Sequence, residues 1–249
     1  MDEVFVIGDL HGSFQALEKL LTKWNAQKQR LIFLGDYINR GNDSLQVIQR
    51  VKELVEDFDA VALKGNHELM FMEWLKEPEK YALTFLNIGG VPTLQSMKTF
   101  VINEEPTIDE LIEGIKREHS QLLTWMENLP LYYRWGQYFF SHAGINPFVR
   151  RGEESTEQEL LWIRDDFTEF PHEAEDIVVF GHTPTTNLNK DLSSEVWISP
   201  CCKKIGIDGG ILYPDGRLNG VVLTKGNPSI IIHSVMNDEL LIEQRTLAG

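Results

Sequence analysis

The sequence predicts a mixed α/β fold, and two observations carry that prediction. Three units in the first 76 residues repeat one order: a short apolar run, a glycine, polar side chains and then a helical pattern. From residue 132 onwards the chain changes to short apolar runs separated by glycine and turn residues. Successive strand–helix units are typical of parallel strands covered by helices, whereas the later runs favour strands joined by short turns.

The first unit begins with the apolar run 4–7 and ends in Gly8-Asp9-Leu10-His11-Gly12. A helix is expected next, with Ser13 at its N-cap and an apolar face that continues to Trp24. Asp9 and His11 are two residues apart, so both side chains project to one side of an extended segment. They are candidate metal ligands, although a turn with a capping aspartate would explain the same residues.

The second unit adds another carboxylate and an arginine. The apolar run 31–34 predicts a buried parallel strand, and Asp36 follows it at the carboxyl end, where open α/β sheets place ligands. Arg40 lies on the next loop and is suited to holding a phosphate through two parallel hydrogen bonds. We expect a helix after it, with Asp43 or Ser44 at the N-cap.

The third unit adds an amide and a second imidazole. The run 60–63 predicts a short strand, Lys64-Gly65-Asn66-His67-Glu68 follows it, and helical spacing continues through Leu75. Three such units indicate a βαβαβα arrangement with its site at the carboxyl ends of the strands. Residues 64–68 could also be only a helix start, because Glu68 is favourable near a helix N-terminus whatever the function.

Residues 77–129 show helical patterns and no strand signals. We interpret this stretch as a helical cap over the rim of the site, inserted into a single domain that spans residues 1–249. Gly89-Gly90-Val91-Pro92 is expected to break the helices. The cap could select the substrate or serve only for packing. The expected helices within it are 81–86, 108–116 and 120–127.

From Tyr132 the chain is expected to form mainly strands, and polar residues follow several of them. His142 and His182 come after two of these runs, and Asp208 lies in a third. Asp208 could orient a ligand histidine or stabilise a turn at Gly209-Gly210. The last three strands are expected to form an antiparallel sheet. The expected strands are 132–135, 138–140, 177–180, 205–210, 220–223, 230–235 and 240–244.

Composition excludes several classes of protein. The net charge is −15 over 249 residues, which argues against a general nucleic-acid-binding surface. No apolar run approaches the roughly 18 residues that a membrane helix needs, and the first residues lack the basic region of a signal peptide, so we expect a cytoplasmic protein. The two cysteines, Cys201 and Cys202, are adjacent, which excludes a disulfide scaffold. The oligomeric state is left open.

The polar residues at the strand ends form a mixed nitrogen and oxygen ligand set without a thiolate. Such a set suits manganese, iron or zinc better than calcium. It exceeds what one four-coordinate ion requires and suits two ions about 3.5–4 Å apart, a recurring arrangement for phosphate-ester displacement. Manganese is our first choice. The members of the set are Asp9, His11, Asp36, Asn66, His67, His142 and His182.

Five motifs in order resemble the phosphoprotein-phosphatase branch of the calcineurin-like metallophosphoesterases. That family implies a four-layer sandwich, in which two mixed β-sheets are flanked by helices. The resemblance extends from residue 8 to about residue 184, and Ile207-Asp208-Gly209-Gly210 is similar to a further segment of bacterial members. The five motifs are Gly8-Asp9-Leu10-His11-Gly12, Gly35-Asp36-Tyr37-Ile38-Asn39-Arg40-Gly41, Gly65-Asn66-His67-Glu68, His142-Ala143-Gly144 and Gly181-His182-Thr183-Pro184.

The resemblance implies a role for each of these residues. Asp9, His11 and Asp36 would hold one metal ion, and Asp36 would bridge to a second ion completed by Asn66, His142 and His182. A hydroxide between the ions would attack phosphorus in line, without a phosphoenzyme. His67 would protonate the leaving oxygen, while Arg40 and, with a looser motif, Arg164 would hold phosphate oxygens. Imidazole titrates near neutral pH and arginine offsets phosphoryl charge, so these roles are chemically consistent.

One residue departs from the protein phosphatases. They carry an aspartate before the arginine, and this chain has Asn39. A neutral amide orients an imidazole but does not stabilise its protonated form by charge, so Asn39 is expected to tune His67. The symmetrical diadenosine-tetraphosphatases of the same family also lack that aspartate.

The sequence motifs by themselves favour a serine/threonine protein phosphatase acting on a phosphoprotein. A symmetrical hydrolase of dinucleoside polyphosphates is the alternative, and phosphotyrosine or small phosphomonoesters are also compatible with the inner site. A non-catalytic metal-binding scaffold is the third hypothesis, and missing ligands would be its signature. Every ligand position of the family is filled.

Overall fold

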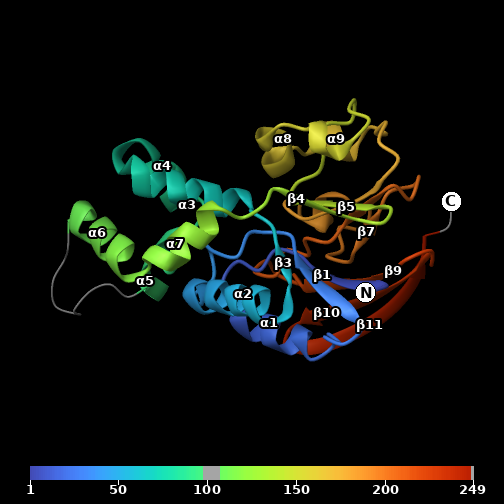
Figure 1. The fold of residues 1–249 in the computed structure, drawn as a ribbon, viewed down its shortest axis with the longest axis horizontal. Helices are drawn as coiled ribbons and strands as arrows, with labels where there is room; N and C mark the ends of the chain where they lie inside the picture. The colour runs from blue at the N-terminus through green and yellow to red at the C-terminus, as the bar shows by residue number, and fades with distance from the viewer. Residues whose placement is uncertain (98–106, 248–249) are drawn as a thin grey trace.

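Two β-sheets pack face to face in the computed structural model, which describes residues 1–97 and 107–247. Helices cover the outer face of each sheet (Figure 1). This is the predicted fold class, two mixed sheets flanked by helices. One apolar cluster fills the space between the sheets. A second lies between the first sheet and its helices, and a third between the second sheet and its helices.

The first sheet has the order β11-β10-β9-β1-β2-β3. Its strands β1, β2 and β3 are parallel, as the strand–helix units predict, and β9 joins β1 in antiparallel register. The last three strands are antiparallel to one another but extend this first sheet, a placement that their apolar patterns do not reveal. The strands are β1 (Glu3–Ile7), β2 (Gln29–Phe33), β3 (Val61–Ala62), β9 (Leu218–Thr224), β10 (Ser229–Met236) and β11 (Glu239–Thr246).

The second sheet has the order β4-β5-β6-β8-β7. The expected hairpin forms its edge, and β5, β6 and β8 are parallel, so their carboxyl ends meet at one edge. The short strand β7 was not expected from the sequence, and β8 ends before Asp208. The strands are β4 (Tyr132–Trp135), β5 (Tyr138–Ser141), β6 (Ile177–Phe180), β7 (Trp197–Ile198) and β8 (Lys204–Gly206).

Helices outside the cap pack against the sheets. The first three follow the strands of the first sheet as predicted, although neither Ser13 nor Asp43 makes a capping hydrogen bond with its side chain. Trp24 lies beyond the end of α1, because that helix stops at Leu21. The elements are α1 (Phe14–Leu21), α2 (Ser44–Phe58), α3 (Asn66–Lys76), α8 (Glu157–Trp162), α9 (Asp165–Thr168), and the 3-10 turns η1 (Gly152–Glu154) and η2 (Thr185–Asn187).

Residues 77–129 are largely helical where the structure describes them, and they lie together at one end of the molecule beside α3 (Figure 1). Gly89 and Gly90 separate two helices as expected, but Val91 and Pro92 begin a helix instead of extending the break. Proline is tolerated there because it occupies the first turn. The cap helices are α4 (Pro78–Asn87), α5 (Val91–Met97), α6 (Ile108–Glu118) and α7 (Ser120–Glu127).

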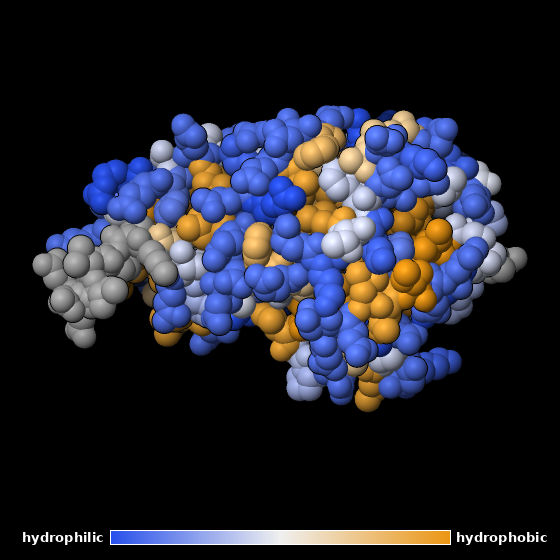
Figure 2. Space-filling model, turned by 90° about the horizontal axis from the view of Figure 1, so that it is seen from below, coloured by the Kyte–Doolittle hydropathy of each residue, from blue (hydrophilic) through white to orange (hydrophobic). Residues whose placement is uncertain are grey.

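The surface mixes polar and apolar residues. Figure 2 shows hydrophobic residues gathered on the part of the lower face formed by β10 and β11, where Ile231 and Ile242 are exposed. Within the described residues, no helix combines the length and apolar character needed to span a membrane.

Candidate metal centre

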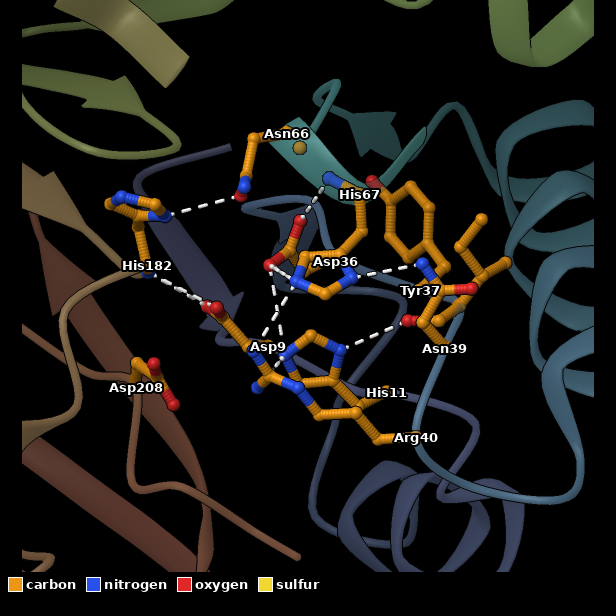
Figure 3. A network of polar contacts seen from close by, with 12 residues as sticks. Asp9, His11, Asp36, Tyr37, Asn39, Arg40, Asn66, His67, His182 and Asp208 are labelled. Atoms are coloured by element: carbon orange, nitrogen blue, oxygen red, sulfur yellow. Dashed lines mark hydrogen bonds and ion pairs between the residues drawn. The ribbon is translucent and has the colours of Figure 1, made fainter. Parts of the chain in front are cut away.

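The seven candidate ligands lie at the carboxyl ends of strands from both sheets, and all are buried (Figure 3). The chain turns sharply at several of these points. The backbone φ is 43° at His11, 54° at Asp36 and 61° at His182, all in the left-handed region that non-glycine residues rarely adopt. Such strain persists only where surrounding structure holds it, and it is concentrated at functional sites.

Two glycines allow close approach of the carboxylates. A Cβ atom at Gly181 would lie 2.0 Å from Asp9 Oδ1, and one at Gly65 would lie 2.2 Å from Asp36 Oδ1. In the space this leaves, the backbone N–H of His182 donates to the Asp9 carboxylate at 3.0 Å, and that of His67 donates to Asp36 Oδ1 at 3.0 Å. The motif glycines therefore fix the direction of both carboxylates.

The imidazoles of His11 and His142 turn a lone pair towards the cluster. His11 Nδ1 lies 2.9 Å from the Ile38 carbonyl oxygen and His142 Nδ1 lies 2.9 Å from that of Leu34. A carbonyl oxygen only accepts, so each Nδ1 carries the proton and each Nε2 faces the cluster as an acceptor. Burial lowers the pKa of His11 to about 3 and that of His142 to about 4, and it lowers the pKa of His182 to about 2.

Acceptor atoms meet at the centre of the cluster. His142 Nε2 lies 2.9 Å from Asn66 Oδ1 and 3.4 Å from Asp36 Oδ1, and His182 Nδ1 lies 3.1 Å from the same Asn66 oxygen. Two facing lone pairs are unfavourable unless a cation lies between them. The donor set therefore fits divalent metal ions.

Asp36 belongs to two groups of metal-competent atoms, each gathered within 4.8 Å: one with His11 and His67, the other with His142 and His182. Asp9 lies outside both groups. Burial raises the pKa of Asp36 to about 7, and burial, Asp208 and Asp36 together raise the pKa of Asp9. Buried carboxylates that repel one another are the charge pattern a cation would offset.

Arg40 reaches into the cluster from the loop after β2. Its Nη1 lies 2.8 Å from His11 Nε2 and its Nη2 lies 3.3 Å from His67 Nε2 (Figure 3). Arg164 approaches from the connection between α8 and α9, where it donates to the His182 carbonyl oxygen at 3.0 Å. Two guanidinium groups thus flank one cluster. Asp208 also lies beside it, and its carboxylate accepts the N–H of Gly210 at 2.8 Å, which is the turn-stabilising role.

Asn39 contacts His67 as the sequence led us to expect, and a cap residue fixes its orientation. The Asn39 Nδ2 lies 3.0 Å from His67 Nδ1, while Asn39 Oδ1 accepts from the Thr93 hydroxyl at 2.9 Å. Because Thr93 holds the amide oxygen, the amide N–H faces Nδ1, which places the imidazole proton on Nε2. Thr93 is fully buried in α5. No sequence pattern singled it out, because it lies outside the motifs.

Glu68 does more than begin a helix. Its buried carboxylate accepts the backbone N–H groups of Asp36 at 2.9 Å, Tyr37 at 2.8 Å and Gly65 at 2.9 Å. It therefore ties the loop after β2 to the start of α3 and holds Asp36 against His67. The sequence placed Glu68 in the third motif, and that position was the only indication from the sequence that Glu68 belongs to the site.

Comparison with known proteins gives a family match over most of the chain. The model of the calcineurin-like phosphoesterases matches residues 3–233. A symmetrical bis(5'-nucleosyl)-tetraphosphatase of Methylococcus capsulatus is 30% identical over 162 residues, which is 61% of this chain and 49% of that protein. The asymmetrical bis(5'-nucleosyl)-tetraphosphatase PrpE of Anoxybacillus flavithermus is 27% identical over 237 residues, 84% of this chain and 90% of that one. The chain spans about half the length of the symmetrical relatives.

Solved structures share the fold. One named as a provisional diadenosine tetraphosphatase has a TM-score of 0.63 at 22% identity and covers 95% of both chains. A protein serine/threonine phosphatase of Saccharomyces cerevisiae has a TM-score of 0.52 at 16% identity and covers 99% of this chain and 80% of its own. At these identities the likeness concerns architecture alone.

Proposed function

The chain belongs to the calcineurin-like phosphoesterases, and from that premise we propose that it hydrolyses dinucleoside tetraphosphates. The names of its relatives favour this substrate over a phosphoprotein, which the sequence motifs by themselves favour. The observation that carries the proposal is Asn39, since the symmetrical diadenosine-tetraphosphatases resemble this chain in lacking the aspartate that most protein phosphatases have at this position.

The donor set fits two divalent ions. Asp9, His11 and Asp36 would hold one, and Asp36, Asn66, His142 and His182 the other. Bound there, such ions activate water as a nucleophile and offset the negative charge that develops on phosphoryl oxygens. Manganese is our first choice, with iron or zinc as alternatives.

The protein's own side chains would bind and orient the substrate. Arg40 approaches the cluster from the loop after β2 and Arg164 from the connection between α8 and α9, so they can hold oxygens of one polyphosphate from two sides. Their positive charge is needed because the chain as a whole carries −15. Bidentate contacts of this kind fix the scissile bond relative to the cluster.

His67 is suited to protonating the leaving phosphate. Asn39 donates to its Nδ1, so Nε2 carries a proton, and Nε2 is the ring atom that faces Arg40. That N–H and the guanidinium are both donors, so an oxygen bound between them would accept from both. Loss of this proton from the neutral ring would leave an imidazolate, so His67 acts as the acid from its protonated form. Burial lowers the pKa of His67, and the negative charge of a bound polyphosphate would favour its protonated form.

The test is manganese-dependent hydrolysis by the wild type, His67→Asn and the control His172→Asn, whose histidine lies outside the cluster. Diadenosine tetraphosphate, a phosphothreonine peptide and para-nitrophenyl phosphate are run in parallel. We expect the dinucleotide to be cleaved at least tenfold faster, and the His67 variant to lose about 100-fold or more of that rate. Two ADP molecules identify symmetrical cleavage, and ATP with AMP identify asymmetrical cleavage.

Two other outcomes would reject the proposal. Preference for the peptide would restore the protein-phosphatase hypothesis. Absence of bound transition metal together with no turnover of any phosphoester after manganese loading would support a non-catalytic scaffold.

A further inference from the structure

An aromatic hollow lies next to the candidate metal centre on the side of the second sheet. It has a volume of about 440 Å³ and is lined by Phe148, Trp162 and Phe170 among other residues. Phe148 is 79% exposed and Phe170 is 55% exposed. Large aromatic rings that stay exposed around one hollow mark a binding surface more often than a packing defect.

The hollow adjoins the site through Trp162. The Trp162 ring forms part of its wall and packs edge-on against the ring of His182, with centroids 6.1 Å apart. Ile163, which also lines it, directly precedes Arg164. A molecule whose phosphates contact Arg164 could therefore place its next group in the hollow.

The charge of the lining excludes phosphate as the occupant. The described residues that line the hollow include Glu159 and Asp166 but no lysine or arginine. The exposed polar side chains of Gln158 and Asp166 are available at the lining to pair with a polar edge. The occupant that fits is a flat aromatic group with hydrogen-bond donors at its edge.

We propose that the aromatic hollow binds a nucleobase of the substrate, stacked on Phe148, Trp162 or Phe170, while the attached phosphates lie between Arg40 and Arg164. This inference rests on the proposed function, which supplies a polyphosphate with a base at each end. Asp166 favours bases with an exocyclic amino group, because a carboxylate accepts from that group and repels a carbonyl oxygen. Every base can stack on an aromatic side chain, so stacking alone does not select one. The hollow would select among bases through the polar edge that faces Asp166.

The test measures binding by calorimetry to the manganese-loaded protein. One ligand is a diadenosine tetraphosphate analogue in which methylene groups replace all three bridging oxygens between phosphorus atoms. The second is methylenediphosphonate, which has no base, and the third is a phosphothreonine peptide. The variants are Phe148→Ala, Phe170→Ala and the control Phe58→Ala, a phenylalanine 49% exposed at the far end of α2.

We expect either hollow variant to weaken the dinucleotide analogue about 5- to 150-fold, the effect of one lost stacking ring, and to leave methylenediphosphonate unchanged. Phe58→Ala should change neither affinity. Unchanged binding of the analogue in both hollow variants, or equal weakening of the analogue and methylenediphosphonate, would overturn the proposal. Weakened binding of the phosphothreonine peptide alone would overturn it too and assign the hollow to a peptide side chain.

The outcome is separable from that of the proposed function. A protein that binds the analogue through Phe148 but does not cleave diadenosine tetraphosphate would refute the hydrolase proposal and retain the base site. Cleavage of diadenosine tetraphosphate, together with unchanged binding of the analogue by both hollow variants, would support the hydrolase proposal and refute the base site.

Discussion

The loops at the strand ends and the helical cap contribute to the same cluster in different ways. The strand-end loops and the first turn of α3 supply every candidate ligand, and backbone groups hold several of those side chains in place. The cap supplies no candidate ligand among its described residues, yet Thr93 holds the amide of Asn39 and the Gly89 carbonyl oxygen accepts the backbone N–H of Arg40 at 2.8 Å.

The strand-end region therefore determines which ligands the site has, and the cap determines how neighbouring side chains are oriented. Removing a ligand from a strand-end loop removes a charge or a lone pair that the cluster needs. Removing a hydrogen bond made by the cap leaves the ligands intact and changes only how His67 and Arg40 are oriented. Substitutions in the two regions should therefore differ in their effect on metal content as well as on rate.

The largest effect is expected for Asp36→Asn, because Asp36 belongs to both groups of metal-competent atoms. Loss of its charge should lower activity more than about 100-fold, beyond the effect usual for residues that only orient ligands. Metal content, measured by mass spectrometry, should fall together with activity. The exposed control Asp57→Asn should retain normal activity and metal content. Full metal content in Asp36→Asn would contradict the ligand assignment.

Metal removal should destabilise the protein in a pH-dependent way. The pKa of Asp36 is raised from 3.8 to about 7 by burial in the metal-free protein, so the native state binds more protons than the unfolded state between these values. Stability of the metal-free protein should therefore fall as pH rises through this window. Bound manganese offsets the charge and should contribute about 2.7 kcal/mol at 100 times its Kd.

Thermal unfolding with and without manganese at pH 5 and pH 7.5 measures this effect. The gain in Tm from the metal should be larger at pH 7.5. An equal gain at both pH values would show that the buried carboxylates do not govern metal binding.

An intermediate effect is expected for Thr93→Val, which removes the hydroxyl that orients Asn39. We expect kcat on diadenosine tetraphosphate to fall about tenfold, the equivalent of one hydrogen bond, with metal content unchanged. Thr84→Val, at an exposed threonine of the same cap, is the matched control. If Thr93→Val lowered the metal content instead, the distinction between the two regions would fail.

The smallest effect is expected for Asn39→Asp. A carboxylate there would stabilise protonated His67 by charge, so the acidic side of the pH–rate profile should change while the rate near its optimum shifts severalfold. Rates from about pH 4.5 to about pH 9 measure this change. An unchanged profile would show that position 39 does not tune His67.

Much of this site was predictable because its signals are local. Asp9, Asp36 and Asn66 each follow a short apolar run that forms a strand, and parallel strands bring their carboxyl ends to one edge. The βαβαβ order and the three helices that follow these strands needed no more than periodicity. The cap helices α4, α6 and α7 also lie close to their predicted bounds, whereas α5, which carries Thr93, was not predicted.

The sequence by itself determined which residue types stand at the strand ends, since the motifs specify both the turn and the side chain that follows it. Only the tertiary structure decided that β9 pairs with β1, that Thr93 reaches Asn39 across 54 residues and that Trp162 packs on His182. These interactions join segments far apart in the chain, so no local spacing records them. They depend on how the sheets and the cap pack, which is set by the shape of the whole core.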